Sequence, residues 1–395
     1  MHPTTRLRHF RRTAPPFRRA VLAATPLLFI AAVPAAAQQP SPESTSGVQL
    51  SGVLFTHFRY GGDAGDRSES RFDVERAYLN FRADLGERLG IAVTADVFQQ
   101  RDTARAGYYR GWALRAKYAY LQYDVLAGDD APLGLNGNLR LGLLNTVIIG
   151  HEDDYWPRWI TETVVDRYDF QSSADAGAAF ELESAGGALE LYATVTNGEG
   201  YQRGEVDRFK DYAARLSVRP FTGLGTWASS LVITPWGSLG SRGSRFVDGA
   251  GTVAPVGRGL DRNMWGVFAG YRAPALTLGA EIAVRLDETE AADTLGDLEP
   301  TFGEETRRVA SAFILARPLA LLDSASRLPL GIVFRYDRLT SSATPDGHGN
   351  TIIAGLTWDL SSRVSLALDY QGETRHDGFD GPDTRTYFLH TVARF

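Results

Sequence analysis

Residues 76–97 decide the fold, and they read Arg-Ala-Tyr-Leu-Asn-Phe-Arg-Ala-Asp-Leu-Gly-Glu-Arg-Leu-Gly-Ile-Ala-Val-Thr-Ala-Asp-Val. Apolar residues occupy every second position from Ala77 to Leu85, and again from Ile91 to Val97. Side chains alternate between the two faces of a β-strand, so this period of two predicts two strands with one apolar face each. The glycines of residues 86–90 predict a tight turn between them.

The same alternation recurs along most of the chain, in segments of roughly ten residues separated by turn residues. Leu330, Ile332 and Phe334 belong to one apolar set, whereas Trp227, Leu231 and Ile233 form a less regular ninth segment. We count about sixteen segments, and bacterial single-chain barrels have an even number of strands. The predicted fold is therefore all-β, a transmembrane antiparallel β-barrel.

The connections between these segments alternate in length. Those near 86–90 and 360–363 are short, whereas those near 237–261 and 338–349 are long and polar. We therefore expect short periplasmic turns at one end of the barrel and long extracellular loops at the other, as outer-membrane barrels have.

The first 37 residues are predicted to be a secretory signal. Six arginines and no acidic residue precede an apolar run, which ends at Ala35-Ala36-Ala37. This is the three-part pattern of a signal peptide, cleaved near Ala37. The alternative is a membrane anchor, but the run is short and prolines interrupt it. Residues 38–47 are a short lead, and residues 48–395 are expected to form the barrel.

Composition limits the classes of function. The formal net charge of −6 becomes −12 once the six signal arginines are removed, and this argues against nucleic-acid binding. The chain has no cysteine, so it has neither disulfides nor thiolate metal sites. The histidines show no paired spacing typical of zinc, and we predict no cofactor and no metal.

The chain ends in an alternating segment with a terminal aromatic residue. Tyr387, Leu389 and Phe395 lie on its apolar face. This pattern resembles the signal by which outer-membrane proteins reach the barrel-assembly machinery. Together with the export signal it predicts a location in the bacterial outer membrane, in contact with lipid and lipopolysaccharide.

Three further segments resemble the phosphate-selective porin O and P family. They are residues 72–79 (Phe-Asp-Val-Glu-Arg-Ala-Tyr-Leu), 194–198 (Thr-Val-Thr-Asn-Gly) and 212–220 (Tyr-Ala-Ala-Arg-Leu-Ser-Val-Arg-Pro). Their order and spacing match over roughly residues 50–395. The resemblance implies a 16-stranded, often trimeric, pore with an inward-folded third loop. It also implies that phosphate or another anion is a candidate solute.

The best candidate for that inward-folded loop is residues 146–173. It is acidic and carries Glu152, Asp153 and Asp154 close to Arg158. The inward-facing positions of the strands hold bases and acids in similar numbers, and no lysine ladder is present, whereas an anion pore would use a ring of arginine or lysine. Including the loop, the candidate pore-lining residues are Arg59, Arg76, Arg82, Arg140, Glu152, Asp153, Asp154, Arg158, Arg215, Arg219, Arg285 and Arg335.

The predicted function is passive diffusion of small hydrophilic solutes or ions through a water-filled channel, with weak selectivity or a mild preference for cations. Two alternatives remain: an adhesin or structural barrel, and a barrel hydrolase with a Ser–His pair. No nucleophile elbow occurs, and we expect no catalytic residue. His151-Glu152-Asp153-Asp154 lacks the spacing of a calcium loop, so a solvated acidic loop is the favoured interpretation.

Overall fold

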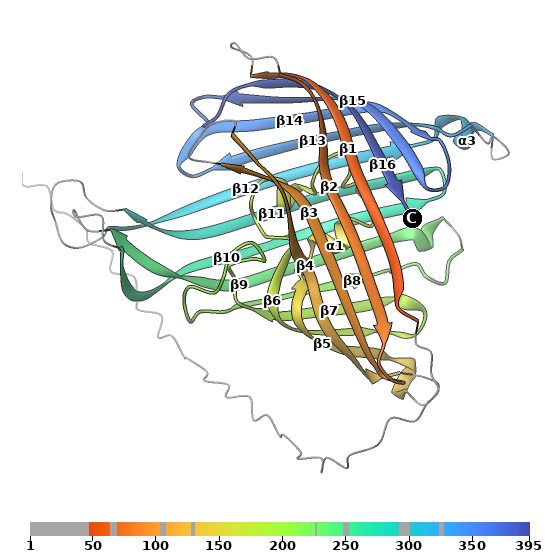
Figure 1. Cartoon of the computed structure of the whole chain (residues 1–395), viewed down its shortest axis with the longest axis horizontal. Helices are drawn as coiled ribbons and strands as arrows, with labels where there is room; N and C mark the ends of the chain where they lie inside the picture. The colour runs from red at the N-terminus through yellow and green to blue at the C-terminus, as the bar shows by residue number, and fades with distance from the viewer. Residues whose placement is uncertain are drawn as a thin grey trace, which may run out of the picture. The chain divides into compact units, whose positions relative to one another are not determined.

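The chain forms a closed β-barrel, as a computed structural model shows for residues 47–63, 69–102, 108–127, 131–225, 227–247, 253–291, 301–323 and 328–395 (Figure 1). All neighbouring strands are antiparallel, and the first strand pairs with the last. The sixteen strands are β1 (Gln49–Asp63), β2 (Glu69–Asp84), β3 (Leu89–Asp102), β4 (Tyr108–Leu126), β5 (Asn136–Asn145), β6 (Ala174–Glu183), β7 (Leu189–Thr196), β8 (Asp211–Val218), β9 (Leu231–Val247), β10 (Val253–Ala273), β11 (Leu276–Ala291), β12 (Thr301–Ala316), β13 (Leu330–Ser341), β14 (Thr344–Asp359), β15 (Val364–His376) and β16 (Thr384–Arg394). The predicted fold class is confirmed.

In the residues that the structure describes, helical structure is confined to short turns. The α-helices are α1 (Ile149–Glu152), α2 (Val164–Arg167) and α3 (Pro318–Leu322), and the 3-10 turns are η1 (Pro132–Gly134), η2 (Ala185–Gly187) and η3 (Ala228–Ser230). Within the described part of the chain, none of these helices has the length and apolar character needed to cross a membrane.

The faces of the strands follow the predicted alternation. Leu141, Leu356 and Leu368 project outward and are 66%, 58% and 58% exposed. Arg335 and Asp337, which lie between outward-facing residues of β13, are buried in the barrel interior. A closed barrel pairs its backbone hydrogen-bonding groups between neighbouring strands, so its outer face can be apolar while its inner face is polar.

Two predicted loops are instead extended strand. Most of residues 237–261 belongs to β9 and β10, and most of residues 338–349 belongs to β13 and β14, which only Ser342 and Ala343 separate. In these segments the outward-facing side chains are mostly polar, so the apolar alternation ends. The backbone hydrogen bonds between the paired strands nevertheless continue. Trp227 also lies outside β9, in the turn before η3.

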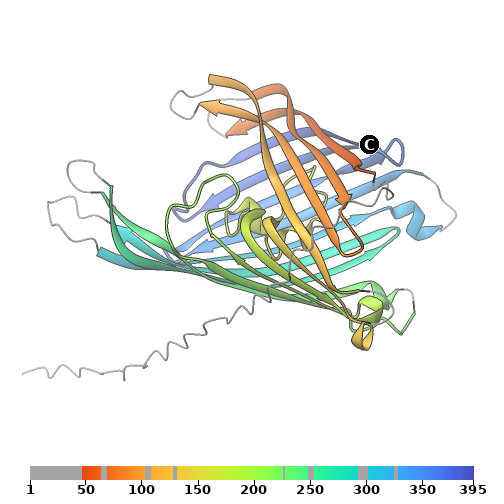
Figure 2. The same ribbon diagram turned by 60° about the horizontal axis from the view of Figure 1, so that its bottom comes forward.

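The barrel interior is not empty, because residues 146–173 fold into it from the end of β5 (Figure 2). Ile148, Val165 and Phe170 of this segment are buried against inward side chains such as Trp236 and Phe268. Trp156 and Ile160 pack against a second group of inward residues on β1, β2 and β13–β16. We call residues 146–173 the inner loop.

Two β-bulges change which side chains enter the interior. Phe55 pairs with Arg76 but Thr56 pairs with Val74, so Glu75 is an extra residue in β2. Ala95 pairs with Ala116 but Thr94 pairs with Tyr118, so Lys117 is an extra residue in β4. A bulge lets two consecutive side chains face the same side of a sheet.

Candidate channel constriction

Two cavities flank the inner loop. One has a volume of about 600 Å³ and is lined by Thr94, Lys117 and Arg394. It lies on the side of the barrel where β2 turns into β3 and where β16 ends, which we call the turn end. The other has a volume of about 560 Å³ and is lined by Arg76 and by residues 198–203 between β7 and β8, at the opposite end, which we call the loop end. Arg158 lines both.

The wall of this narrow region is built around one buried carboxylate. Asp96 of β3 is fully buried, and Arg76 donates to its Oδ2 over 2.8 Å. Arg115 donates to the same oxygen from Nε over 2.9 Å, and its Nη2 donates to the Tyr201 hydroxyl over 3.0 Å. Charge-assisted bonds of this kind are short and strong, so they fix both guanidinium groups in place.

Lys117 adds a third basic group to the wall. The β4 bulge turns it inward, where its Nζ donates to the Tyr78 hydroxyl over 3.2 Å and lies 4.6 Å from the centre of the Tyr78 ring. Its side chain is 3% exposed. The wall therefore holds two guanidinium groups, one amine and one carboxylate.

The inner loop presents the opposite balance. Arg158 donates to Asp166 and lies 3.4 Å from Asp153. Burial lowers the pKa of Arg158, but Asp153 and Asp166 more than offset this and the pKa lies well above its ordinary value. Burial raises the pKa of Asp153, while Arg158 and then Lys117 of the wall act to lower it. The loop thus offers two carboxylates and one cation to the wall.

We call these seven residues the eyelet: Arg76, Asp96, Arg115 and Lys117 on the wall, and Asp153, Arg158 and Asp166 on the loop. Four basic groups face three acidic groups, with more basic groups on the wall and more acidic groups on the loop. The field at the eyelet is therefore directed from the wall toward the loop, and the net charge is small.

Several arginines of the wall hold the inner loop in position. Arg335 is 1% exposed, is bonded to Asp337 over 2.8 Å, and donates from Nη1 to the Glu162 carbonyl over 2.7 Å. Arg285 donates to the Asp169 carbonyl. Arg167 of the loop donates to Glu373 of β15. Arg335 is thus a loop anchor and not a group that meets solutes.

Glu152 is also turned away from the two cavities of the eyelet. It is 3% exposed and lies beside Glu281, Thr163 and Arg335. Burial, followed by the negative field of Glu281, raises the pKa of Glu152 well above its ordinary value. Burial therefore favours the neutral form of its carboxyl, and the acidic stretch predicted for the constriction contributes Asp153 and Asp154 to the cavity lining but not Glu152.

The remaining predicted lining residues are spread over the interior. Arg140, Arg215 and Arg219 line a separate cavity of about 220 Å³ behind the inner loop, together with Asp154 and Glu190. Arg215 donates to Glu190 over 2.5 Å, and Arg140 donates to Glu181. Two residues lie toward the barrel ends: Arg59 is bonded to Glu69, and Arg82 is exposed near the turn end of β2. Arg285 lines the cavity toward the loop end.

Sequence reasoning missed Arg115 and Lys117. Tyr118 and Tyr120 of β4 lie inside, so strict alternation would put Arg115 and Lys117 on the outer face. The bulge at Lys117 shifts the alternation by one residue, and both side chains therefore face the interior. Two adjacent polar residues, Lys117 and Tyr118, interrupt the apolar alternation there. That interruption is the signal that could have revealed the bulge.

The chain terminus closes the barrel on its outer face. Tyr387, Leu389 and Phe395 are 54%, 43% and 61% exposed. Phe395 exchanges two backbone hydrogen bonds of 3.0 Å with Gly52 of β1. A Cβ at Gly52 would lie 2.3 Å from the Phe395 ring, so any other residue at position 52 would force that ring to move.

The fold is shared with solved outer-membrane proteins. The outer-membrane channel DcaP of Acinetobacter baumannii has a TM-score of 0.58 at 14% identity, over 90% of this chain and 100% of that one. OmpF of Salmonella typhi, in complex with daunomycin, has a TM-score of 0.58 at 12% identity, over 88% and 97%. A trimer form of OmpT, an outer-membrane protein of Vibrio cholerae, has a TM-score of 0.54 at 10% identity, over 88% and 99%.

No protein-family model matches the chain, and no curated protein sequence matches it. At 10–14% identity, the similarity to solved structures establishes the barrel fold of outer-membrane proteins. The specific resemblance to the phosphate-selective porin O and P family stays a prediction.

Proposed function

We propose that the chain is an outer-membrane porin, through which small hydrophilic solutes and ions diffuse passively. The observation that carries this proposal is the pair of cavities inside the barrel, one on the turn-end side and one on the loop-end side of the inner loop, both of which Arg158 lines. The charged eyelet between them keeps the passage wet and restricts the size of solutes. No catalytic step is part of the proposal, and neither adhesion nor a structural role requires such a passage.

Weak ion selectivity is part of the proposal. The eyelet holds nearly equal numbers of cations and carboxylates, and both Arg76 and Arg115 are already bonded to Asp96. A phosphate ion would have to compete with that buried carboxylate for the same donors. A strong preference for phosphate is therefore not favoured by this arrangement.

The proposal includes three kinds of partner. Lipid and lipopolysaccharide would cover the outward apolar face, and the barrel-assembly machinery would recognise the terminal strand that ends at Phe395. Assembly as a homotrimer is included because one OmpT structure with this fold is a trimer form.

Single-channel conductance in planar bilayers tests the function, with liposome swelling in sugars of rising size as a second measurement. Thr94 lines the cavity toward the turn end, and its neighbour Val93 faces outward. We expect Thr94→Trp to lower conductance and the size limit, and Val93→Trp to leave both unchanged. A folded wild-type barrel that conducts no ions, or equal effects of the two variants, would contradict the proposal.

A further inference from the structure

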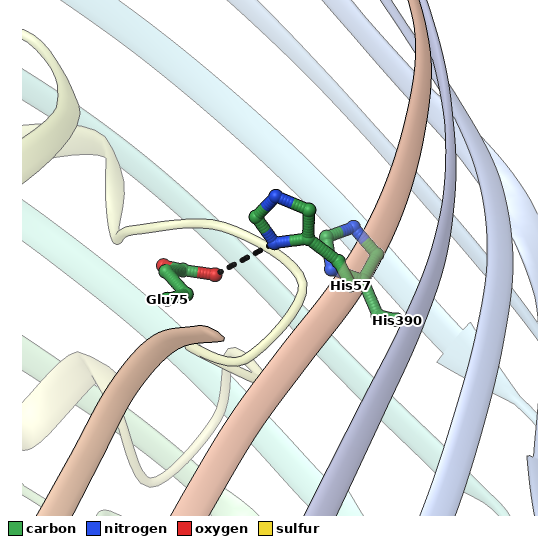
Figure 3. A group of neighbouring side chains, drawn as sticks. All are labelled: His57, Glu75 and His390. Carbon is green, nitrogen blue, oxygen red and sulfur yellow. Dashed lines mark ion pairs between the residues drawn. The ribbon is translucent and has the colours of Figure 1, made fainter. Parts of the chain in front are cut away.

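Two histidines meet where the barrel closes. His57 of β1 and His390 of β16 are direct cross-strand partners, and both side chains point into the barrel (Figure 3). Their ring centres are 5.6 Å apart. Glu75 of β2 faces the same space, with its Oε2 3.7 Å from His57 Nδ1. One potential ligand atom from each residue lies within 4.8 Å of the other two.

The bulge in β2 places the carboxylate there. Glu75 is the extra residue between Val74 and Arg76, and its side chain enters the interior beside His57. Bulges are often used to re-aim a side chain toward a functional site. Regular pairing would give this part of β2 only one inward residue, whereas the bulge gives it both Glu75 and Arg76.

The imidazole nitrogens lack hydrogen-bond partners. Neither ring nitrogen of His57, and neither of His390, is hydrogen-bonded to any other described residue, although all four are shielded from solvent. His390 is 2% exposed. Buried polar atoms are rarely left unsatisfied, and such atoms often indicate a missing ion or water. One nitrogen from each of the two rings, together with the Glu75 carboxylate, forms the donor set of a metal site.

We propose that His57, Glu75 and His390 bind a divalent transition-metal ion of the zinc class inside the barrel. Two imidazoles and one carboxylate suit Zn²⁺ and neighbouring first-row ions, whereas Ca²⁺ and Mg²⁺ prefer oxygen ligands only. Zinc–nitrogen bonds of about 2.0–2.1 Å place tetrahedral ligands about 3.3 Å apart, so rotation of these side chains by roughly 1 Å closes the site. Water from the interior takes the fourth position.

Asp369 completes the arrangement behind His390. Its Oδ2 lies 3.3 Å from His390 Nε2, and its Oδ1 accepts a hydrogen bond from Gln371 over 3.1 Å. A carboxylate behind a ligating histidine fixes the ring and its tautomer. His390 therefore binds the ion through Nδ1, and Asp369 is a positioning residue.

The bound ion links three strands across the closing seam. Backbone hydrogen bonds already join β1 to β16 and β1 to β2. The ion adds a connection among all three strands through the side chains of Glu75, His57 and His390. A second group, Glu199, Glu205 and Asp207, comes equally close but consists of carboxylates at or near the surface, and it carries no proposal.

The test uses the full folded barrel in detergent, stripped of metal by a chelator. His348 and His376 form a second cross-strand histidine pair, stacked at 4.6 Å, so both are first replaced by Ala to remove a competing site. Zn²⁺ is then titrated by calorimetry, and Cu²⁺ is added for electron paramagnetic resonance. We expect one ion per chain, a Cu²⁺ spectrum with coupling to two nitrogens, and a higher temperature for the heat-induced gel shift.

Three variants locate the ion. Because Glu75 is partly exposed, Glu75→Gln should fold normally, and it should weaken Zn²⁺ binding at least 10-fold. His390→Asn should abolish the two-nitrogen signal. Asp369→Asn should weaken binding by about 10- to 100-fold while keeping both nitrogens, as the loss of a partner behind a metal ligand does. Absence of stoichiometric Zn²⁺ binding, or unchanged binding in both Glu75→Gln and His390→Asn, overturns the proposal, whereas loss of conductance alone would bear on the porin function only.

Discussion

Two adjacent acidic residues should differ completely in their effect on ion selectivity. Asp153 faces the eyelet beside Arg158, whereas Glu152 is buried next to Glu281 with its pKa raised well above the ordinary value by burial. Asp153→Asn removes a negative charge from the passage. Glu152→Gln changes a buried carboxyl that lines neither of the two cavities and whose raised pKa favours the neutral form. We therefore expect only Asp153→Asn to shift the selectivity, and the shift should favour anions.

The size of this shift follows from Coulomb's law. An ion about 6 Å from Asp153 in water-filled space interacts with it by about 0.7 kcal/mol. Screening with a Debye length of ~10 Å at 0.1 M salt reduces this to about 0.4 kcal/mol. That energy is about a twofold change in the local concentration of each ion, since 1.4 kcal/mol is tenfold. The ratio of anion to cation permeability should rise about fourfold.

Reversal potentials across a planar bilayer with a KCl gradient measure this ratio. The measurement is repeated at several pH values, because burial raises the pKa of Asp153 and the shift requires the ionised carboxylate. The shift should shrink at about 1 M salt, where the Debye length is about 3 Å. Arg76→Gln serves as the opposite control, because it removes a wall cation and should shift the ratio toward cations.

Equal shifts in Asp153→Asn and Glu152→Gln would refute the burial of Glu152. An unchanged reversal potential in Asp153→Asn at low salt would place the narrowest part of the channel away from Arg158.

Three further predictions concern stability and assembly. The pKa of Glu152 is raised above 4.5 in the folded protein, so the folded state binds its proton more tightly than the unfolded state. The free energy of unfolding should therefore fall as the pH rises from about 4.5 through the folded-state pKa. Urea titrations followed by tryptophan fluorescence should show a smaller pH dependence in Glu152→Gln. Arg335→Met leaves Asp337 buried and unpaired, so it should cost about 3–5 kcal/mol and increase single-channel noise, whereas a combined Arg335→Met, Asp337→Leu variant should be closer to the wild type in stability. Deletion of Phe395 should impair outer-membrane assembly and leave export intact, as measured by membrane fractionation, and normal assembly of the truncated chain would contradict the assigned role.

The strand faces could be predicted from the sequence because lipid and water impose opposite demands on alternate residues. Leu139 and Leu141 of β5 face outward and Arg140 faces inward, as the period of two indicates. Beyond the apolar belt that constraint disappears. There the polarity of the side chains does not indicate whether the backbone continues as a strand. A long loop was predicted near 338–349, but only two residues separate the end of β13 from the start of β14.

The inner loop shows the second limit of sequence reasoning. Its acidic composition indicated a constriction, and Asp153 and Asp154 do line a cavity. Composition could not show that Glu152 turns toward Glu281, because that orientation depends on a wall residue more than a hundred positions away in the chain. The same holds for the loop anchors, in which Arg335 binds the carbonyl of Glu162.

The bulge in β2 connects the eyelet to the seam. Glu75 and Arg76 are adjacent in the sequence, and in a regular strand they would face opposite sides of the sheet. The extra residue turns both inward, Arg76 toward Asp96 and Glu75 toward His57. Charged residues on the lipid-facing surface are destabilising, and a bulge allows two consecutive charged residues both to face the interior. Two adjacent charged residues that interrupt the apolar alternation of a strand therefore predict a bulge, and they indicate where charged side chains are brought together inside the barrel.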